Sequence, residues 1–261
     1  MKVLVTFAVD AEVAPWRKLR KFRFIDYEGL RLWRSDAGDV EITALVTGMG
    51  VEAAAYAMDL MMRMADAEQH FEVCISSGLA GALAESLNPE EIIAPQGIMV
   101  ERKHADWPSE RLEVDAELRN RALDLGAKCT DCLFTSDQVM VKAKQKRDCA
   151  SKAQAVDMES FEIVKVACAW GARAVVVRAI SDSAKEDLPI NFNLTLSGEK
   201  QVSVGKVAAQ LAKNPLALPS LIRFARQSRR AAETLANFLE KYVPGLASVD
   251  SLDRSKAVAA Q

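Results

Sequence analysis

Three acidic residues stand where apolar segments of this chain end. Glu12 follows the first apolar segment, Glu159 follows a short one at 154–156, and Asp182 closes the segment at 173–180. If these segments are strands of an open α/β sheet, ligands bind beyond their carboxyl ends, so the three carboxyls are expected to converge there. Grouped acids suit chemistry at the anomeric carbon of a sugar, where a cationic transition state needs an acid, an anion and a positioned nucleophile. The pattern therefore predicts cleavage of a glycosidic bond.

The other reactive side chains favour no competing class of catalysis. His70 and His104 are the only histidines, and neither has a serine or cysteine partner in a recognisable triad motif. Cys129 and Cys132 form a single CxxC pair, without the second pair of ligands that a zinc site of this type requires. The five cysteines are therefore interpreted as buried structural thiols, and no metal or cofactor is expected.

The acids need a scaffold, and alternating strand and helix patterns predict one. Apolar segments at 2–9, 71–76, 128–135 and 173–180 are typical of buried parallel strands, and helical patterns at 10–21, 51–65, 115–126 and 159–170 separate them. Further strands are expected at 30–35, 40–47 and 92–102, and a turn of small residues at 77–81. This order predicts an α/β fold, a three-layer α/β/α domain around a central mixed, mostly parallel sheet.

Length and charge limit the other possibilities. The 261 residues fit one catalytic domain at 1–200, a helical extension of the same domain at 201–243 and a disordered tail at 244–261. The formal net charge of −2 gives no basic footprint for nucleic acid. No apolar run approaches the roughly 18 residues of a membrane span, and Asp10 and Glu12 interrupt the first apolar segment too early for a signal peptide. We predict a cytoplasmic protein.

Four segments together resemble the nucleoside phosphorylase and nucleosidase superfamily, in particular the methylthioadenosine/S-adenosylhomocysteine nucleosidases. They lie in order at 6–13, 46–50, 76–83, and 155–159 with 175–182. The last pair is the most specific, because a short strand ending in Met-Glu, a helix, and a strand ending in Arg-Ala-Ile-Ser-Asp are hard to obtain together by chance. The resemblance implies a nucleoside phosphorylase-like fold, and a purine nucleoside as substrate.

The resemblance also implies a role for each acid. Asp182 resembles the general acid that protonates purine N7, and Glu12 stands where nucleosidases orient the attacking water. Glu159 resembles the ribose ligand, since a carboxylate accepts hydrogen bonds from the 2′ and 3′ hydroxyls and its charge favours an oxocarbenium-like transition state. Arg178 is interpreted as a structural charge that pairs with a nearby acid, either Asp157 or Glu12.

Apolar residues complete the substrate site that the resemblance implies. Met158 is expected to pack on the sugar or base, and Val9 and Met49 to contact the 5′ substituent. The base-binding positions are Gly78, Leu79, Val139 and Met140. Leu79 replaces a small or polar residue of the nucleosidases, and Val139 replaces their stacking aromatic. These departures argue against ordinary methylthioadenosine as the substrate.

A second branch of the superfamily accounts better for the departures. The segments 78–81 and 156–160, and a similarity that continues into 202–236, look like the hopanoid-associated phosphorylases. That family releases adenine from adenosylhopane with phosphate as nucleophile, so phosphate is a possible co-substrate. We favour this function slightly over a nucleosidase that uses water. The alternative from another class is a nucleoside-binding or membrane-associated module without catalysis.

The pattern of the C-terminal region predicts a helix that contacts the domain, a partner subunit or a membrane. Helices are expected at 206–213 and 216–242, and the second carries an apolar face and an arginine-rich one. The apolar residues are Leu218, Leu221, Ile222, Ala225, Leu235, Phe238 and Leu239, and the arginines are Arg223, Arg226, Arg229 and Arg230. Such a helix docks on the domain or a partner subunit, or lies on an anionic membrane surface. The resemblance further implies a homo-oligomer, a dimer or larger.

Overall fold

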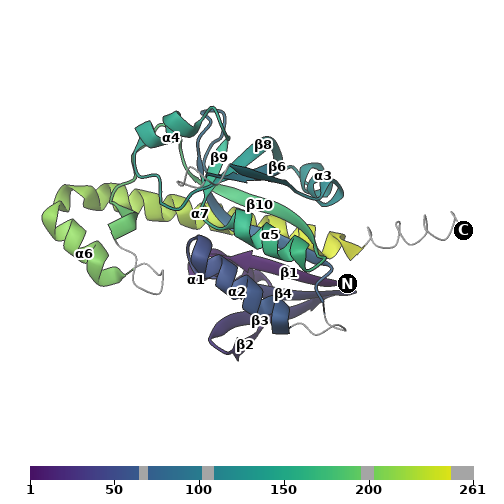
Figure 1. The fold of residues 1–261 in the computed structure, drawn as a ribbon. Helices are drawn as coiled ribbons and strands as arrows, with labels where there is room; N and C mark the ends of the chain where they lie inside the picture. Colours follow the sequence, from purple (N-terminus) through teal and green to yellow (C-terminus); the bar gives the residue numbers. More distant parts are fainter. Residues whose placement is uncertain (65–69, 102–108, 195–202, 248–261) are drawn as a thin grey trace, which may run out of the picture.

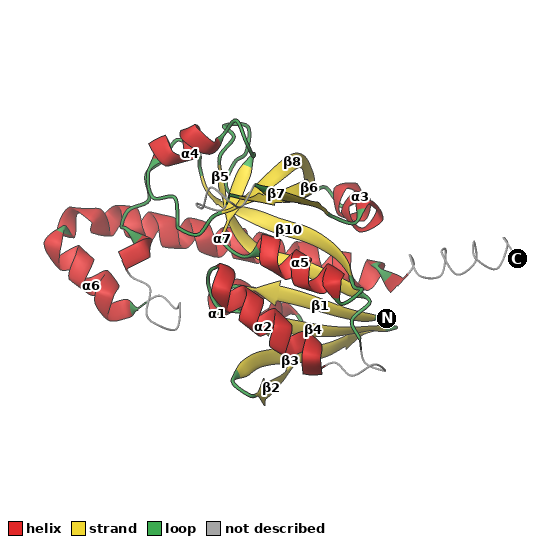
Figure 2. Ribbon diagram, in the orientation of Figure 1, coloured by secondary structure: helices red, strands yellow, loops and turns green. Residues whose placement is uncertain are grey.

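The computed structural model describes residues 1–64, 70–101, 109–194 and 203–247, and within them the strands join in one mixed sheet (Figures 1 and 2). The strands are β1 (Lys2–Phe7), β2 (Arg23–Tyr27), β3 (Leu30–Ala37), β4 (Val40–Val46), β5 (Val73–Ala82), β6 (Ile92–Val100), β7 (Glu110–Glu113), β8 (Lys128–Thr135), β9 (Ala155–Asp157) and β10 (Arg173–Asp182). β1 lies parallel to β4 and β5, while β4, β3 and β2 form an antiparallel meander. The mixed α/β fold is thus confirmed.

On the other side of β5 the sheet closes on itself. β5 pairs with β10 and β9, β10 pairs with β6, and β8 joins β6 to β9. The five strands form a barrel-like ring, which the sequence did not predict. At one end of the ring, Gly81 in β5 stands beside both Asp182 in β10 and Val156 in β9. The ring therefore brings together three strand ends that are far apart in the chain.

Helices cover both faces of the sheet, as the three-layer prediction requires. They are α1 (Asp10–Leu19), α2 (Val51–Met64), α3 (Ala116–Asp124), α4 (Ala143–Cys149), α5 (Ser160–Ala169), α6 (Val204–Lys213) and α7 (Leu218–Gly245). Buried side chains of α2 and α5 share one apolar core with β-strand residues such as Leu4 and Val176. A second core on the opposite face unites α1, α3 and the end of α7 with Val3 and Val177. Alternate residues of one strand thus face opposite cores.

The expected turn at 77–81 is wrong, because β5 continues through it to Ala82. This part of β5 is held on both sides, by β10 and by β9, so its backbone hydrogen bonds are satisfied in an extended strand. Small side chains suit the crowded interior rather than a change of direction. The short strands β2 and β7, which lie at edges of the sheet, were also not predicted.

The cysteine interpretation is partly wrong. Cys74 and Cys132 are buried, but Cys129 and Cys168 are exposed. Cys129 lies in the first part of β8, where Lys128 and Asp131 are exposed as well, and Cys168 lies near the exposed end of α5. Two of the five thiols therefore face solvent.

The C-terminal helix has two parts with different surroundings. Its second part docks on the domain: Leu235, Leu239 and Val243 are fully buried, and Tyr242 Oη donates a hydrogen bond to the carbonyl of Leu118. Its first part projects with α6 beyond the sheet (Figure 1), and there Leu218 and Ile222 are exposed. α7 ends at Gly245, and 248–261 lie outside the described residues. No helix in the described ranges has the length and apolar character of a membrane span.

Candidate functional site

The predicted site residues line one pocket at the carboxyl ends of β1, β5 and β10. The pocket has a volume of about 180 Å³. Among its lining residues are Asp182, Glu12, Glu159, Met158, Leu79, Val139, Met140, Met49 and Val9. Gly78 alone of the predicted set does not line the pocket, since it lies behind Leu79 in β5. Residues separated by up to 173 positions are thus brought together, as convergence of the strand ends required.

Glu12 is fixed in the first turn of α1, directly after β1. Its Oε2 accepts a hydrogen bond from the N–H of Ala8 at 2.9 Å, and its Oε1 accepts one from the N–H of Leu79 at 3.0 Å. Burial raises the pKa of this carboxyl, and the nearby Arg178 guanidinium and the backbone N–H donors offset part of that effect. A buried carboxylate with a raised pKa is suited to accept a proton near neutral pH.

Glu159 stands at the N-cap of α5, just after β9. Its Oε1 accepts a hydrogen bond of 2.7 Å from the N–H of Gly50, so the glycine turn after β4 holds the acid in place. Burial raises the pKa of Glu159 to about 8, and the Asp157 carboxylate adds to that effect. The Arg178 charge and the Gly50 hydrogen bond act in the opposite direction.

Arg178 is the structural charge that the sequence predicted, and its partner is Asp157. Its Nη2 lies 2.6 Å from Asp157 Oδ2, and both side chains are essentially inaccessible to solvent. The same nitrogen donates to the hydroxyls of Ser76 and Ser160. The guanidinium therefore neutralises one acid of a cluster of buried acids, a requirement for keeping such charges in a core.

Gly78 makes room for this cluster. Its φ is +130°, a backbone conformation that residues other than glycine rarely adopt. A Cβ at this position would lie 2.6 Å from Arg178 Nη1 and 2.8 Å from Glu12 Oε2. Gly78 therefore lets Glu12 and Arg178 approach the strand.

Asp182 ends β10 and is held at both oxygens. Ser181 Oγ lies 2.5 Å from Oδ1, and Lys146 Nζ in α4 lies 2.5 Å from Oδ2. The sequence analysis missed Lys146. A signal existed, because Lys146 shares a helix face with Ala143 and Ala150, and a lysine on an apolar face is unusual in an otherwise solvated basic helix.

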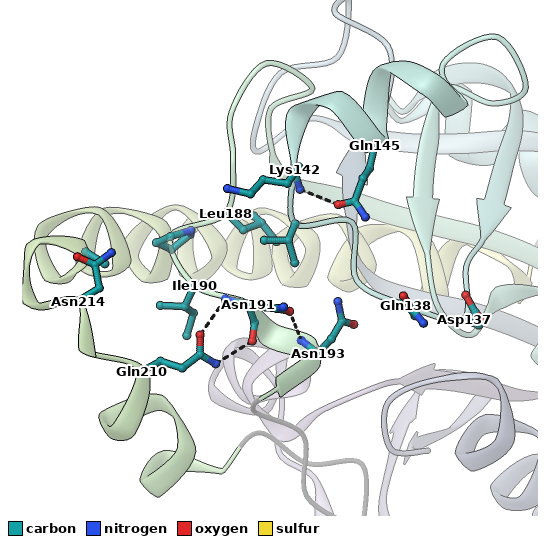
Figure 3. Close-up of a pocket in the computed structure, with 13 residues that line it drawn as sticks. Asp137, Gln138, Lys142, Gln145, Leu188, Ile190, Asn191, Asn193, Gln210 and Asn214 are labelled. Carbon is teal, nitrogen blue, oxygen red and sulfur yellow. Dashed lines mark hydrogen bonds between the residues drawn. The ribbon is translucent and has the colours of Figure 1, made fainter. Parts of the chain in front are cut away.

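Val139, in the apolar wall of the pocket, is held by Asn193, which lines a second cavity next to the pocket. Asn193 receives a hydrogen bond from the N–H of Val139 and donates one to its carbonyl, which fixes Val139 in place. The second cavity has a volume of about 680 Å³. In it, the backbone N–H of Asn191 donates a hydrogen bond to the Gln210 side chain in α6, and that side chain donates one back to the Asn191 carbonyl (Figure 3). Gln138 and Leu188 line both cavities, so they form the partition between the two.

A third cavity adjoins the pocket and lies along α1 and α7. It measures about 600 Å³, and its lining is mostly apolar and comes from Pro15, Leu19 and Ala232 among others. Val9, Glu12 and Leu79 line both this cavity and the pocket. An apolar cavity thus lies directly beside the pocket, on the other side of Val9 and Leu79.

Comparison with known proteins places the fold in a family. The model of the phosphorylase superfamily matches residues 2–243. The 5'-methylthioadenosine/S-adenosylhomocysteine nucleosidase of Glaesserella parasuis is 26% identical over 208 residues, which are 70% of this chain and 86% of that protein. The enzyme of the same name from Haemophilus ducreyi is 25% identical over 230 residues, 78% of this chain and 95% of that protein.

Solved structures agree in fold. The 5'-methylthioadenosine/S-adenosylhomocysteine nucleosidase of Helicobacter pylori superimposes with a TM-score of 0.72 at 20% identity, covering 94% of this chain and 99% of that one. A futalosine hydrolase mutant of the same organism gives a TM-score of 0.71 at 20% identity, covering 94% and 100%. At these identities the likeness confirms the nucleoside phosphorylase-like fold.

Proposed function

The chain belongs to the phosphorylase superfamily, and we propose that it cleaves the N-glycosidic bond of a purine nucleoside. The observation that carries the proposal is the convergence of Asp182, Glu12 and Glu159 in one pocket with an apolar wall. The two 5'-methylthioadenosine/S-adenosylhomocysteine nucleosidases described above are similar to this chain in sequence, which supports the proposal. The retained acids argue against a module that only binds.

Each acid has one task in this reaction. Asp182 delivers a proton to N7 of the departing base, so that the electron pair of the C1′–N9 bond leaves on a neutral purine. Glu159 accepts hydrogen bonds from the ribose hydroxyls, and in its ionised form it places negative charge near the sugar as the sugar becomes cationic. Glu12 accepts the proton of the nucleophile, which its raised pKa and its position across the pocket allow.

Water is the nucleophile that the electrostatics favour. Glu12 and Glu159 both line the pocket, and each repels a phosphate dianion when it is ionised. One observation favours phosphate, the co-substrate preferred from the sequence. Arg178 Nε and Nη1 are buried near Glu12 without a hydrogen-bond partner among the described residues, and a guanidinium binds phosphate well. Phosphorolysis is therefore the second candidate.

A nucleoside with a bulky apolar 5′ group is the substrate that we propose within this class. The cavity along α1 and α7 adjoins the pocket at Val9, where the resemblance places the 5′ substituent, and its lining is mostly apolar. The adenosylhopane-type substrate predicted from the sequence fits this description.

The projecting end of α7 agrees with a lipid-linked substrate. It exposes Leu218 and Ile222 beside arginines, as contact with an anionic membrane surface requires. Cosedimentation with anionic vesicles checks this contact, and light scattering in solution checks the expected homo-oligomer.

Base release is the decisive test. The protein is incubated with methylthioadenosine, adenosine and an adenosylated lipid, with and without inorganic phosphate, and adenine and the sugar product are quantified. Free sugar without phosphate supports hydrolysis, and a sugar 1-phosphate formed only with phosphate supports phosphorolysis. Asp182→Asn is expected to lower the rate by about 10²–10⁴-fold, while Asp148→Asn, at an exposed position in α4, leaves it unchanged. No adenine from any substrate refutes the proposal.

A further inference from the structure

Lys146 is a buried lysine whose ammonium group contacts Asp182 in the site. Its side chain is 1% exposed, and its Nζ donates to Asp182 Oδ2 at 2.5 Å and to the carbonyls of Ser183 and Glu186 at 2.7 and 3.2 Å. An ammonium has three protons, so these three acceptors use all of them. The arrangement holds a charged lysine directly against the acid that the proposed function employs.

This contact conflicts with a lone aspartic acid as proton donor. A carboxyl can protonate N7 only if it carries a proton itself, whereas an ammonium at hydrogen-bond distance favours the ionised carboxylate. The short Nζ–Oδ2 hydrogen bond holds a transferable proton between the two groups. A buried ion pair also contributes little to stability compared with apolar packing, so stability alone does not explain a lysine in this place.

We propose that Lys146 supplies the proton that Asp182 delivers to the departing base, so that the general acid is a lysine–aspartate pair. The Nζ–H bond breaks and an Oδ2–H bond forms; the Oδ2–H bond then breaks as N7–H forms and the C1′–N9 electron pair moves into the base. Lys146 is left as a neutral amine that keeps two protons for the carbonyls of Ser183 and Glu186. Water returns the missing proton after the base has left. Lys146 acts through Asp182 and is in this sense a positioning residue.

The elements around Lys146 keep it in register with Asp182. The Asp187 carboxylate accepts from the N–H of Ala143 at 2.8 Å and from Lys142 Nζ at 2.9 Å, which ties the start of α4 to the loop after β10. Among the described residues, Asp182 on β10 is the carboxylate that contacts Nζ, while Asp187 with its partner Lys142 acts on Lys146 from a longer distance. On the far side, Ser181 Oγ lies within hydrogen-bond distance of both Asp182 Oδ1 and the Ala80 carbonyl, so it stays bonded whichever form the acid takes.

The test compares two leaving groups and two replacements. Wild type, Lys146→Met and Lys146→Arg are assayed on a purine nucleoside that the wild type cleaves and on 4-nitrophenyl β-D-ribofuranoside, whose phenolate leaves without a proton. Arginine keeps the charge but does not give up its proton in proteins. Both variants are expected to lose about 10²–10⁴-fold in kcat on the purine nucleoside and less than about tenfold on the phenyl riboside. Lys144→Met, at an exposed position in the same helix, is the control.

The outcomes separate this proposal from the one on which it rests. A wild type that releases no base refutes both the purine-cleaving function and the proton supply. A wild type that is active, with Lys146→Arg equally active on the purine nucleoside, refutes the proton supply alone, because charge then suffices. Equal losses on both leaving groups also refute it, since a general collapse of the site does not discriminate between them.

Discussion

Replacing Glu159 by glutamine is expected to flatten the pH dependence of stability. Glutamine keeps the acceptor for the Gly50 N–H but has no proton to lose. The pKa of Glu159 is raised from 4.5 to about 8 in the folded protein. Between these values the folded state therefore holds a proton that the unfolded state has released, so stability falls as pH rises through the window and levels off above it.

The size of the effect follows from the window. At about 1.4 kcal/mol for each unit of pKa, the free energy of unfolding of Glu159→Gln minus that of the wild type is expected to grow by about 4 kcal/mol from about pH 5 to about pH 9. The Glu12 charge also acts on Glu159, so the difference between the two proteins includes this interaction. Urea unfolding at a series of pH values measures the difference. Glu85→Gln, at an exposed carboxyl, is the control. Parallel curves for Glu159→Gln and wild type, or a gap that narrows as pH rises, refute the reasoning.

Three further substitutions test the other parts of the cluster. Glu12→Gln is expected to lower kcat for base release by about 10²–10⁴-fold, because it removes the proton acceptor of the nucleophile; unchanged turnover contradicts that role. Gly78→Ala is expected to destabilise the fold by about 1–3 kcal/mol, because the methyl group meets Arg178 and Glu12 in a strained backbone conformation; urea unfolding measures it, and a neutral result contradicts the close approach. Arg178→Met leaves Asp157 buried without its ion pair and is expected to cost about 3–5 kcal/mol, seen as a lower Tm; a stability equal to wild type at neutral pH contradicts the pairing.

The sequence predicted the three acids of the pocket better than the strands and side chains that hold them in place. Glu12, Glu159 and Asp182 were predicted because each stands at the end of an apolar segment, and strand ends of one sheet meet at one edge. The sequence also predicted that Arg178 pairs with Asp157 or Glu12, because an arginine in a buried strand needs an acidic partner. These predictions required only local patterns and one rule of topology.

The missed features depend on contacts between distant segments. The small residues after Ser76 favour a turn by composition, and only pairing with β9 and β10 keeps them extended. The closure of the ring has the same origin, because no local pattern specifies that β8 joins β6 to β9. The role of Gly78 appears only when Arg178 and Glu12 are placed beside it. Lys146 left a local signal, but its partner Asp182 is 36 residues away.

The long C-terminal helix also connects its projecting end to the acid of the site. Gln227 Nε2 donates a hydrogen bond of 2.7 Å to the carbonyl of Ser181, the residue before Asp182. Gln227 lies about 14 Å along the helix axis from Leu218, whose side chain is exposed. One continuous helix thus joins the exposed residues at its start, the hydrogen bond to the end of β10 and the buried anchor around Leu235. A ligand that contacts the projecting part of α7 therefore contacts an element that is bonded directly to the residue before Asp182.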